Sequence, residues 1–171
     1  MLLHHPVGDA DDTEHDRLRT ILDACPDDLA LLALDPNHDP GHRGIRAALE
    51  HLPRRIDHLP RPDFIGLLRR AEVLVGNSSA GLIEAAALGL GVVNLGCRQA
   101  GRECGPNVLS LPDITPEAVH AAVVDRRAWT RRHRDHPPPH PWGTGNTGRR
   151  IADQLATLDL GTVPLRKINA Y

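Results

Sequence analysis

Short apolar runs alternate with helix-like stretches along most of this chain. The apolar runs predict strands at Met1–His5, Leu29–Leu34, Arg55–Leu59, Val73–Gly76, Val92–Leu95 and Val108–Leu111. The stretches between them predict helices at Thr13–Ala24, His42–His51, Asp63–Arg70, Gly81–Leu88 and Pro116–Asp125. Apolar strands that alternate with helices are typical of a parallel sheet covered on both faces. The pattern therefore predicts an α/β, Rossmann-like three-layer sandwich with a six-stranded parallel sheet.

This alternation stops after Asp125, which divides the chain into three predicted parts. Residues 1–125 form the Rossmann-like domain, and the proline-, arginine- and histidine-rich residues 126–142 predict an exposed, semi-rigid linker. Residues 143–171 contain a predicted helix at Arg149–Leu158 and a tail, which we expect to pack back on the fold.

Composition and charge exclude several classes of function. The chain of 171 residues is 40% apolar, enough for the core of one domain, and its formal net charge is −2. With 2% aromatic residues and no clustered positive charge, it does not resemble a nucleic-acid-binding protein. No apolar run approaches the roughly 20 residues that span a bilayer, and no signal peptide is evident, so we expect a cytoplasmic protein without membrane contact. Cys25, Cys97 and Cys104 form no C-x-x-C pair and predict neither a disulfide framework nor a thiolate zinc site.

The most informative segment is a strand, a turn of small polar residues and a helix, in residues 73–89. The turn carries Asn77, Ser78 and Ser79, and a helix that starts at Ala80 or Gly81 offers free backbone N–H groups. Small residues and hydroxyl donors at such a position favour a phosphate or diphosphate site. Simple capping of the helix by a serine side chain explains the same residues.

Charged side chains lie close to this turn in the sequence. Glu84 is compatible with a capping box that bonds the backbone near Ser79, and also with hydrogen bonds from ribose hydroxyls. Arg98 and Arg102 follow the fifth predicted strand, where arginine can neutralise a diphosphate with paired hydrogen bonds. Arginine is also common in surface loops, so these two positions alone do not define a site.

Polar side chains end three further predicted strands. His5 ends the first strand, Asn37 follows the second and His58 ends the third. Because the carboxyl ends of parallel strands meet at the edge of a sheet where ligands bind, we expect these side chains to converge with the serine turn. Each of them alone is equally compatible with an ordinary loop residue.

Two other patterns do not indicate the sites that they superficially match. Gly143–Gly148 fits G-x-G-x-x-G but follows a proline-rich segment rather than a strand, so it predicts a turn before a helix capped by Asn146 or Thr147. The histidines of the linker, His133, His136 and His140, lack an organised pair of carboxylates, and a solvated linker explains them better than a metal site. We therefore predict no metal and no cofactor.

The central segments resemble a known enzyme family. Residues 76–84 (GNSSAGLIE) together with 89–102 (GLGVVNLGCRQAGR) are similar to the UDP-N-acetylglucosamine 2-epimerases. Further matching segments occur along the chain in the same order as in that family: His5-Pro6-Val7, Pro36-Asn37, His58 before Phe64, Gly143–Thr147 and Pro164–Lys167. The non-hydrolysing branch usually has an arginine-rich motif after the first histidine, so the residues found here resemble the hydrolysing branch, which forms N-acetylmannosamine or a related sugar.

The resemblance implies that the chain is the C-terminal, nucleotide-binding half of a glycosyltransferase-B architecture. Its ligands would be UDP and a UDP-N-acetylhexosamine, and the proton-transfer carboxylates would belong to a separate N-terminal domain. The resemblance assigns UDP binding to His5, Asn37, His58, Ser78, Ser79, Ala80, Gly81, Glu84, Arg98 and Arg102. Within this set, Arg98 and His5 would stabilise the leaving UDP, Glu84 would hold the ribose, and no metal would be needed because Arg98 supplies the positive charge.

Three alternatives remain open at this stage. The chain is compatible with one half of an epimerase that works with its other half in cis or in trans, and with a non-catalytic UDP-binding module or degenerate remnant. It is also compatible with the donor domain of a glycosyltransferase, although its central motifs are more similar to those of the epimerases. Without the support of a first domain for the last helix, we expect either homo-oligomerisation or local mobility after Arg126.

Overall fold

The strands of this chain form a single parallel sheet. The computed structural model describes residues 1–162. Its strands are β1 (Leu2–Leu3), β2 (Ala33–Leu34), β3 (Arg55–Ile56), β4 (Leu74–Gly76), β5 (Val92–Leu95) and β6 (Val108–Leu111). Their spatial order is β3-β2-β1-β4-β5-β6, and every pair is parallel. The predicted α/β fold with a six-stranded parallel sheet is confirmed, and the strand order is that of the Rossmann fold.

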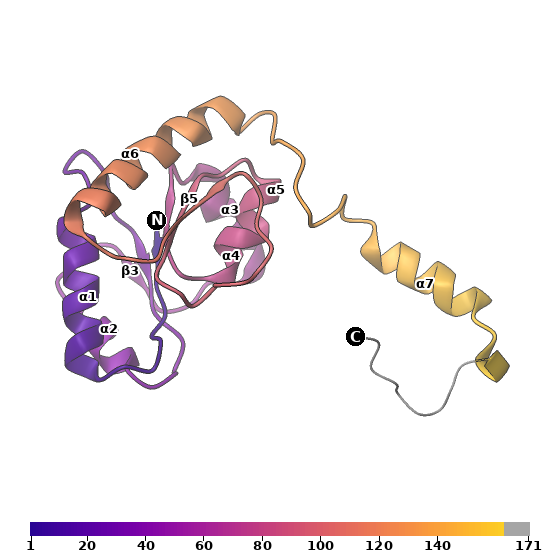
Figure 1. The fold of residues 1–171 in the computed structure, drawn as a ribbon, viewed down its shortest axis with the longest axis horizontal. Coiled ribbons are helices and arrows are strands. Elements are labelled where there is room, and N and C mark those ends of the chain that lie inside the picture. Colours follow the sequence, from indigo (N-terminus) through magenta and orange to yellow (C-terminus); the bar gives the residue numbers. More distant parts are fainter. Residues whose placement is uncertain (163–171) are drawn as a thin grey trace. The chain divides into compact units, whose positions relative to one another are not determined.

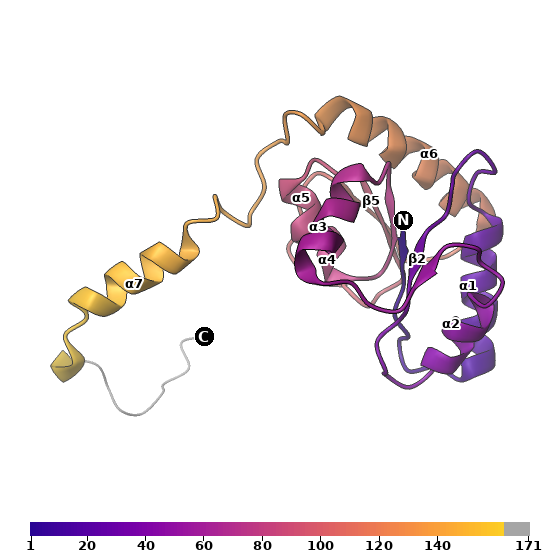
Figure 2. The same ribbon diagram turned by 180° about the vertical axis from the view of Figure 1, so that it is seen from behind.

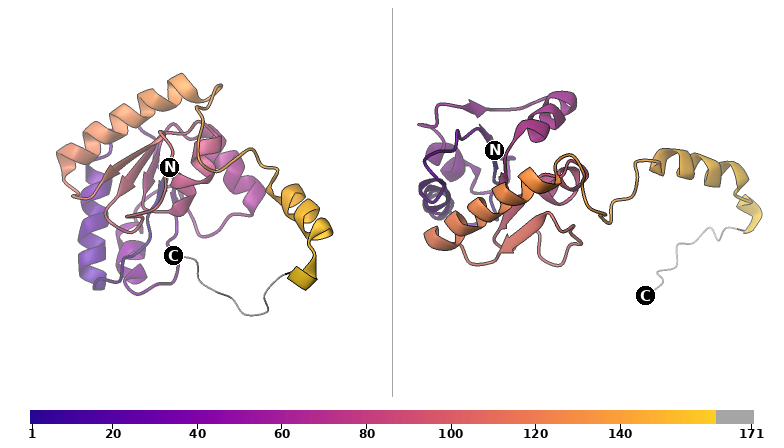
Figure 3. Two further views of the ribbon diagram at one scale, coloured as in Figure 1. Left: turned by 45° about the vertical axis from the view of Figure 1, so that its right-hand side comes forward. Right: turned by 90° about the horizontal axis from the view of Figure 1, so that it is seen from above.

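Helices cover both faces of this sheet (Figure 1). One face carries α1 (Asp11–Asp23), α2 (His42–Ala48) and α6 (Pro116–His133). The other face carries α3 (Arg61–Arg70), α4 (Ser79–Leu82) and α5 (Glu84–Ala87). Figure 2 shows the second helix layer from the front, and Figure 3 shows the strands between the two layers.

Successive residues of a strand enter the two cores in turn. In β4 and the residue before it, Val73 and Val75 belong to the core beneath α1, α2 and α6, whereas Leu74 belongs to the core beneath α3 and α4. Leu2 and Leu3 of β1 divide in the same way. This alternation explains why β1 and β4 are apolar throughout, since both faces of a doubly covered sheet are buried.

The centre of the sheet requires a glycine. Gly76 ends β4 with φ of +141°, and a Cβ atom there would lie 2.0 Å from the carbonyl oxygen of Leu3 in β1. No side chain fits this approach, so the carboxyl ends of β1 and β4 can come together only with glycine at this position. This close approach sets the spacing of the residues that follow the two strands.

The helix after β4 is interrupted, which corrects the continuous helix predicted at Gly81–Leu88. It consists of α4 and α5, separated at Ile83. In a continuous helix the carbonyl of Gly81 would accept from the N–H of Ala85. Here that carbonyl accepts from the side-chain amide of Asn107, at 3.2 Å, which lies beside the interruption.

Helix α6 is longer than predicted. It runs to His133, so the expected linker is helical over its first residues, Arg126–His133. Trp129 and Thr130 are buried there, and the hydroxyl of Thr130 accepts from the N–H of Gly91 at 2.8 Å. The linker interpretation is therefore wrong for this part of the segment, because tertiary contacts stabilise a helix whose charged sequence resembles a solvated stretch.

Residues from Trp142 onwards form a second compact unit, distinct from the unit Met1–Pro141. It contains α7 (Thr147–Thr157) and a 3-10 helix, η1 (Leu160–Thr162). No residue of α7 is buried, and Ile151 and Leu155 are 51% and 65% exposed. The predicted packing of this region on the fold stays a prediction, and the predicted motif Pro164–Lys167 lies outside the described residues.

None of the helices between residues 1 and 162 is both long enough and apolar enough to cross a membrane.

Candidate functional site

The carboxyl ends of β1 and β4 are joined by one buried side chain. The side chain of Asn77, which follows β4, is fully buried. Its Oδ1 accepts from the backbone N–H of His5 at 2.7 Å, and its Nδ2 donates to the backbone carbonyl of His5 at 2.8 Å. β1 and β4 are the strands from which the chain departs in opposite directions, to β2 and to β5, so they define the crevice where ligands bind in such sheets. Asn77 therefore fixes His5 beside the serine turn.

The imidazole of His5 is held in one tautomer. Its Nδ1 lies 3.1 Å from the backbone nitrogen of Asn37 and accepts that N–H, so the proton of the neutral ring resides on Nε2. Partial burial and the nearby charge of Arg98 lower the pKa of His5 to about 4, although Asp39 opposes the shift. At neutral pH this residue is an uncharged donor through Nε2.

Arg98 is fixed to the same turn by its backbone carbonyl. The guanidinium of Arg98 donates to the carbonyl of Asn77 at 3.2 Å, and the buried side chain of Gln99 donates to the same oxygen at 2.7 Å. Among the described residues, no carboxylate forms an ion pair with Arg98. Its positive charge therefore stays available to an anionic ligand at the strand ends.

The serine turn has the geometry of a helix start. Ser78 is the residue before α4, and its hydroxyl accepts from the N–H of Ala80 at 3.4 Å, a long capping bond. The N–H of Gly81 donates to the carbonyl of Ser78 at 3.0 Å. A Cβ atom at Gly81 would lie 2.7 Å from a methyl group of Val92, so glycine is also needed here for packing on β5. The turn thus combines capping with small, ligand-accessible groups, Ser78 and Ser79, that are only partly buried.

Glu84 does not form the predicted capping box. Because Ser78 caps α4, the third position of that helix is Gly81, and Glu84 starts α5 instead. Its carboxylate pairs with Arg61 at the start of α3, with 3.1 Å between oxygen and nitrogen. The side chain of Glu84 is 21% exposed in this pair, so it is not fully enclosed.

Three residues of the predicted set are less closely joined to this cluster. The backbone N–H of Asn37 donates to His5, whereas its side-chain amide donates to the carboxylate of Asp39 at 2.5 Å. His58 and Arg102 are exposed. Arg102 is anchored by its backbone N–H, which donates to the carbonyl of Gln99 at 3.2 Å.

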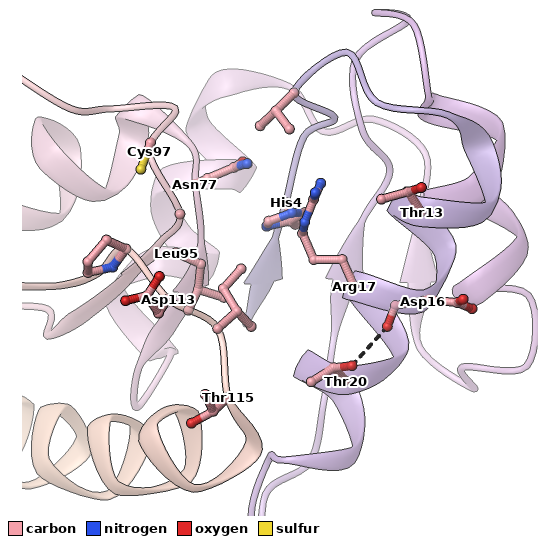
Figure 4. Close-up of a pocket in the computed structure, with 14 residues that line it drawn as sticks. His4, Thr13, Asp16, Arg17, Thr20, Asn77, Leu95, Cys97, Asp113 and Thr115 are labelled. Carbon is pink, nitrogen blue, oxygen red and sulfur yellow. Dashed lines mark hydrogen bonds between the residues drawn. The ribbon is translucent and has the colours of Figure 1, made fainter.

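Two cavities open at the carboxyl edge of the sheet. One, of about 560 Å³, lies among the loops that follow β1, β2 and β5, with Arg98 and Asp39 in its wall. The other, of about 640 Å³, is lined by residues of α1 and by the ends of β1, β5 and β6 (Figure 4). Within residues 1–162 no cluster of three histidine, cysteine or carboxylate side chains could hold a metal ion.

Sequence reasoning placed Asn77 in the serine turn but did not predict how Asn77 and Gln99 connect the site. Asn77 and Gln99 are buried polar residues with bonds to neighbouring loops, and His4 lines the larger cavity with both ring nitrogens unpaired. A polar residue directly after an apolar strand was the available signal for His4 and Asn77.

The fold and the site together define a Rossmann-like α/β domain with a histidine, an arginine and a capped serine turn at its strand ends. A family model described as UDP-N-acetylglucosamine 2-epimerase matches residues 1–156. The chain belongs to the UDP-N-acetylglucosamine 2-epimerase family.

Several characterised proteins are similar to this chain. A UDP-N,N'-diacetylbacillosamine 2-epimerase (hydrolyzing) of Legionella pneumophila is 34% identical over 177 residues, covering 100% of this chain and 46% of the relative. A UDP-N-acetylglucosamine 2-epimerase of Neisseria meningitidis is 31% identical over 83 residues, 46% of this chain and 22% of the relative. A polysialic acid biosynthesis protein P7 of Escherichia coli is 40% identical over 50 residues, 29% of this chain and 13% of the relative. The chain thus spans less than half the length of these relatives.

Proposed function

We propose that this chain is the UDP-binding half of a hydrolysing UDP-N-acetylglucosamine 2-epimerase. The reaction is UDP-N-acetylglucosamine plus water to N-acetylmannosamine plus UDP. A base removes the proton from C2 of the sugar while UDP leaves from C1. Water then adds to the resulting glycal, and the sugar is released as the C2 epimer.

The observation that carries this proposal is the junction at Asn77, which places His5, Arg98 and the serine turn around one crevice. The diphosphate gains negative charge as the C1–O bond breaks, so groups that stabilise that charge lower the barrier. Arg98 supplies a positive charge without a paired carboxylate, and the neutral His5 supplies a donor at Nε2. The hydroxyls of Ser78 and Ser79 add donors, and Glu84 is assigned to the ribose.

The base that takes the C2 proton is assigned to a separate N-terminal domain. The residues of the crevice are assigned to stabilising the leaving group and not to removing the C2 proton. His5, the imidazole among them, carries its proton on Nε2 and acts there as a donor. The relative from Legionella pneumophila is more than twice as long as the matched region, which supports a second half in the complete enzyme. A histidine followed by Pro6 and Val7, in place of an arginine-rich motif, supports the hydrolysing mode.

Calorimetric titration of UDP tests the proposal. The wild-type chain should bind UDP saturably, and Arg98→Ala and Ser78→Ala should each weaken binding at least tenfold. Arg132→Ala removes an exposed arginine from α6 and serves as the matched control, with unchanged affinity. A folded wild-type chain without UDP binding, or equal losses in the control, would contradict the assignment.

Turnover separates the epimerase half from a non-catalytic UDP-binding module. The chain alone, and the chain mixed with a separately produced N-terminal half, should be incubated with UDP-N-acetylglucosamine. Release of free N-acetylmannosamine and UDP from the mixture supports the epimerase. UDP binding without turnover in the mixture supports the module, and transfer of the sugar to an added acceptor supports a glycosyltransferase.

A further inference from the structure

Glu14, in the first turn of α1, is a buried carboxylate that the proposed mechanism does not use. Its exposed fraction is 0%. One carboxylate oxygen accepts from the backbone N–H of Val7 at 2.7 Å, and the other pairs with the guanidinium of Arg17 at 2.6 Å. The carboxylate of Asp9 pairs with the same guanidinium at 2.5 Å. Glu14 and Arg17 therefore join α1 to both ends of residues 7–9, which belong to the loop after β1.

The loop after β2 closes on the same carboxylate. Gly41, at the end of this loop, has φ of +91°, and a Cβ atom there would lie 2.8 Å from Cγ of Glu14 and 2.7 Å from the carbonyl oxygen of Asp9. Earlier in the loop, the backbone N–H of Asn37 donates to Nδ1 of His5 at 3.1 Å. The bond between Asn37 and His5 therefore depends on how closely the loops after β1 and β2 approach each other.

A gain in stability alone does not explain a buried ion pair such as Glu14 with Arg17. Removing two charges from water is costly, and apolar side chains of similar size often stabilise a protein at least as well. A carboxylate differs from such side chains because it accepts hydrogen bonds, and those to an ionised group are short and strong. At Glu14 this acceptor holds the backbone N–H of Val7, two residues after His5.

We propose that Glu14 is a positioning residue for His5. By holding the N–H of Val7, it keeps the loop after β1 against the loop after β2, so that Nδ1 of His5 accepts from Asn37 and the proton stays on Nε2. Arg17 holds the carboxylate in place. Because Glu14 is fully buried, it acts through His5 and does not touch the ligand. This role rests on the proposed function, in which Nε2 of His5 donates to the diphosphate.

Nitrogen-15 shifts of the imidazole rings in the isotope-labelled full chain test the proposal, because they distinguish the two neutral tautomers. In the wild-type chain His5 should carry its proton on Nε2. Glu14→Asp keeps the charge but draws the carboxylate back from Val7 by one methylene, whereas Glu14→Gln keeps the reach and loses the charge. We expect a mixture of tautomers in Glu14→Asp and the wild-type tautomer in Glu14→Gln. A purely structural role would leave the tautomer unchanged in every variant that folds.

UDP titration of the same chains measures the consequence for binding. Glu14→Asp should weaken UDP binding at least threefold, and Glu14→Gln should stay within twofold of the wild type. Asp23→Asn neutralises the carboxylate of α1 that pairs with Arg19 at the surface, and as the matched control it should change neither the tautomer nor the affinity. Gly41→Ala pushes the two loops apart and should also give a mixture of tautomers, which keeps the test valid if the variants of Glu14 do not fold.

The two readouts separate this proposal from the proposed function. The wild-type tautomer in Glu14→Asp, or equal mixtures in Glu14→Asp and Glu14→Gln, would overturn the positioning role. The expected tautomers in a wild-type chain and variants that bind no UDP would support the positioning of His5 and contradict the UDP site.

Discussion

At the scale of single residues, the side-chain amide of Asn77 has the largest structural effect at the site. Asn77→Ala removes both bonds to the backbone of His5 and leaves a partly buried N–H and a partly buried carbonyl without their partners. We expect the free energy of unfolding to fall by about 2–4 kcal/mol, from two lost bonds and the groups left unpaired. Urea unfolding checks this, and UDP binding should weaken in the same variant.

Asn77→Asp is the sharper control for this prediction. The aspartate keeps an acceptor for the N–H of His5 but places a second acceptor against the carbonyl of His5, which received a donor before. Its loss of stability should therefore approach that of Asn77→Ala. An Asn77→Asp chain as stable as the wild type would show that the bond to the carbonyl contributes nothing.

The two histidines after β1 predict a loss of stability in acid. The pKa values of His4 and His5 are lowered to about 3 and about 4 from 6.5. The unfolded chain therefore binds more protons than the folded chain between about pH 6.5 and 4, and the free energy of unfolding falls as the pH falls through that window. The buried His4 contributes at most about 1.4 kcal/mol per pH unit, and the partly exposed His5 contributes less.

Unfolding midpoints at pH 7 and pH 5 measure this effect, together with NMR titration of the imidazole resonances. His4→Phe should flatten the pH dependence, because it removes the larger contribution. Titration of His4 near pH 6.5 in the folded chain would disprove the prediction.

The residue pattern predicted which side chains lie at the ligand edge but not how they are held. His5 and Arg98 could be placed there because each follows an apolar strand. The bonds of Asn77 could not be predicted, since they depend on the register between β1 and β4, whose paired residues are 73 positions apart. The exposure of His58 and the pairing of Glu84 with Arg61 likewise depend on loop paths that no local pattern encodes.

At the scale of elements, the packing of α1 on α2 depends on one glycine. A Cβ atom at Gly44 of α2 would lie 1.7 Å from the carbonyl oxygen of Asp11 in α1, so Gly44→Ala must separate the helices. We expect a loss of about 1–3 kcal/mol or more. Gly66→Ala in α3 is the matched control, because no atom lies within 4 Å of its added Cβ. There the better helix propensity of alanine should stabilise the chain by up to about 1 kcal/mol. Differential scanning calorimetry of both variants measures the two changes in stability.

The length of α6 shows why element boundaries were only partly predictable. The charged end of α6 resembles a solvated linker in sequence, but Arg127 pairs with Glu72 and Asp28, each at 2.6 Å. Arg134 donates to the carbonyls of Arg69 and Ala71 at the end of α3. These partners are distant in sequence, so the contacts that extend the helix leave no local signal. Each predicted strand contains an observed one, but β1, β2 and β3 are shorter than predicted.

At the scale of the whole molecule, the stability of the fold should reside in its first unit. All residues that the structure describes as buried lie within Met1–Pro141, and α7 has none. A chain that ends at Pro141 should therefore still fold and unfold cooperatively in urea, because it keeps all of these buried residues. A truncated chain without a cooperative transition would contradict this prediction.

The position of β1 also has a consequence for biosynthesis. Within this sheet β1 is translated first, yet it lies in the centre, between β2 and β4. At about 5–20 residues per second, the ~70 residues that separate β1 from β4 take roughly 4–14 seconds to be translated. Throughout that interval the apolar Leu2 and Leu3 lack one of their two neighbouring strands. The nascent chain therefore offers chaperones the apolar segment of β1 until Gly76 has emerged.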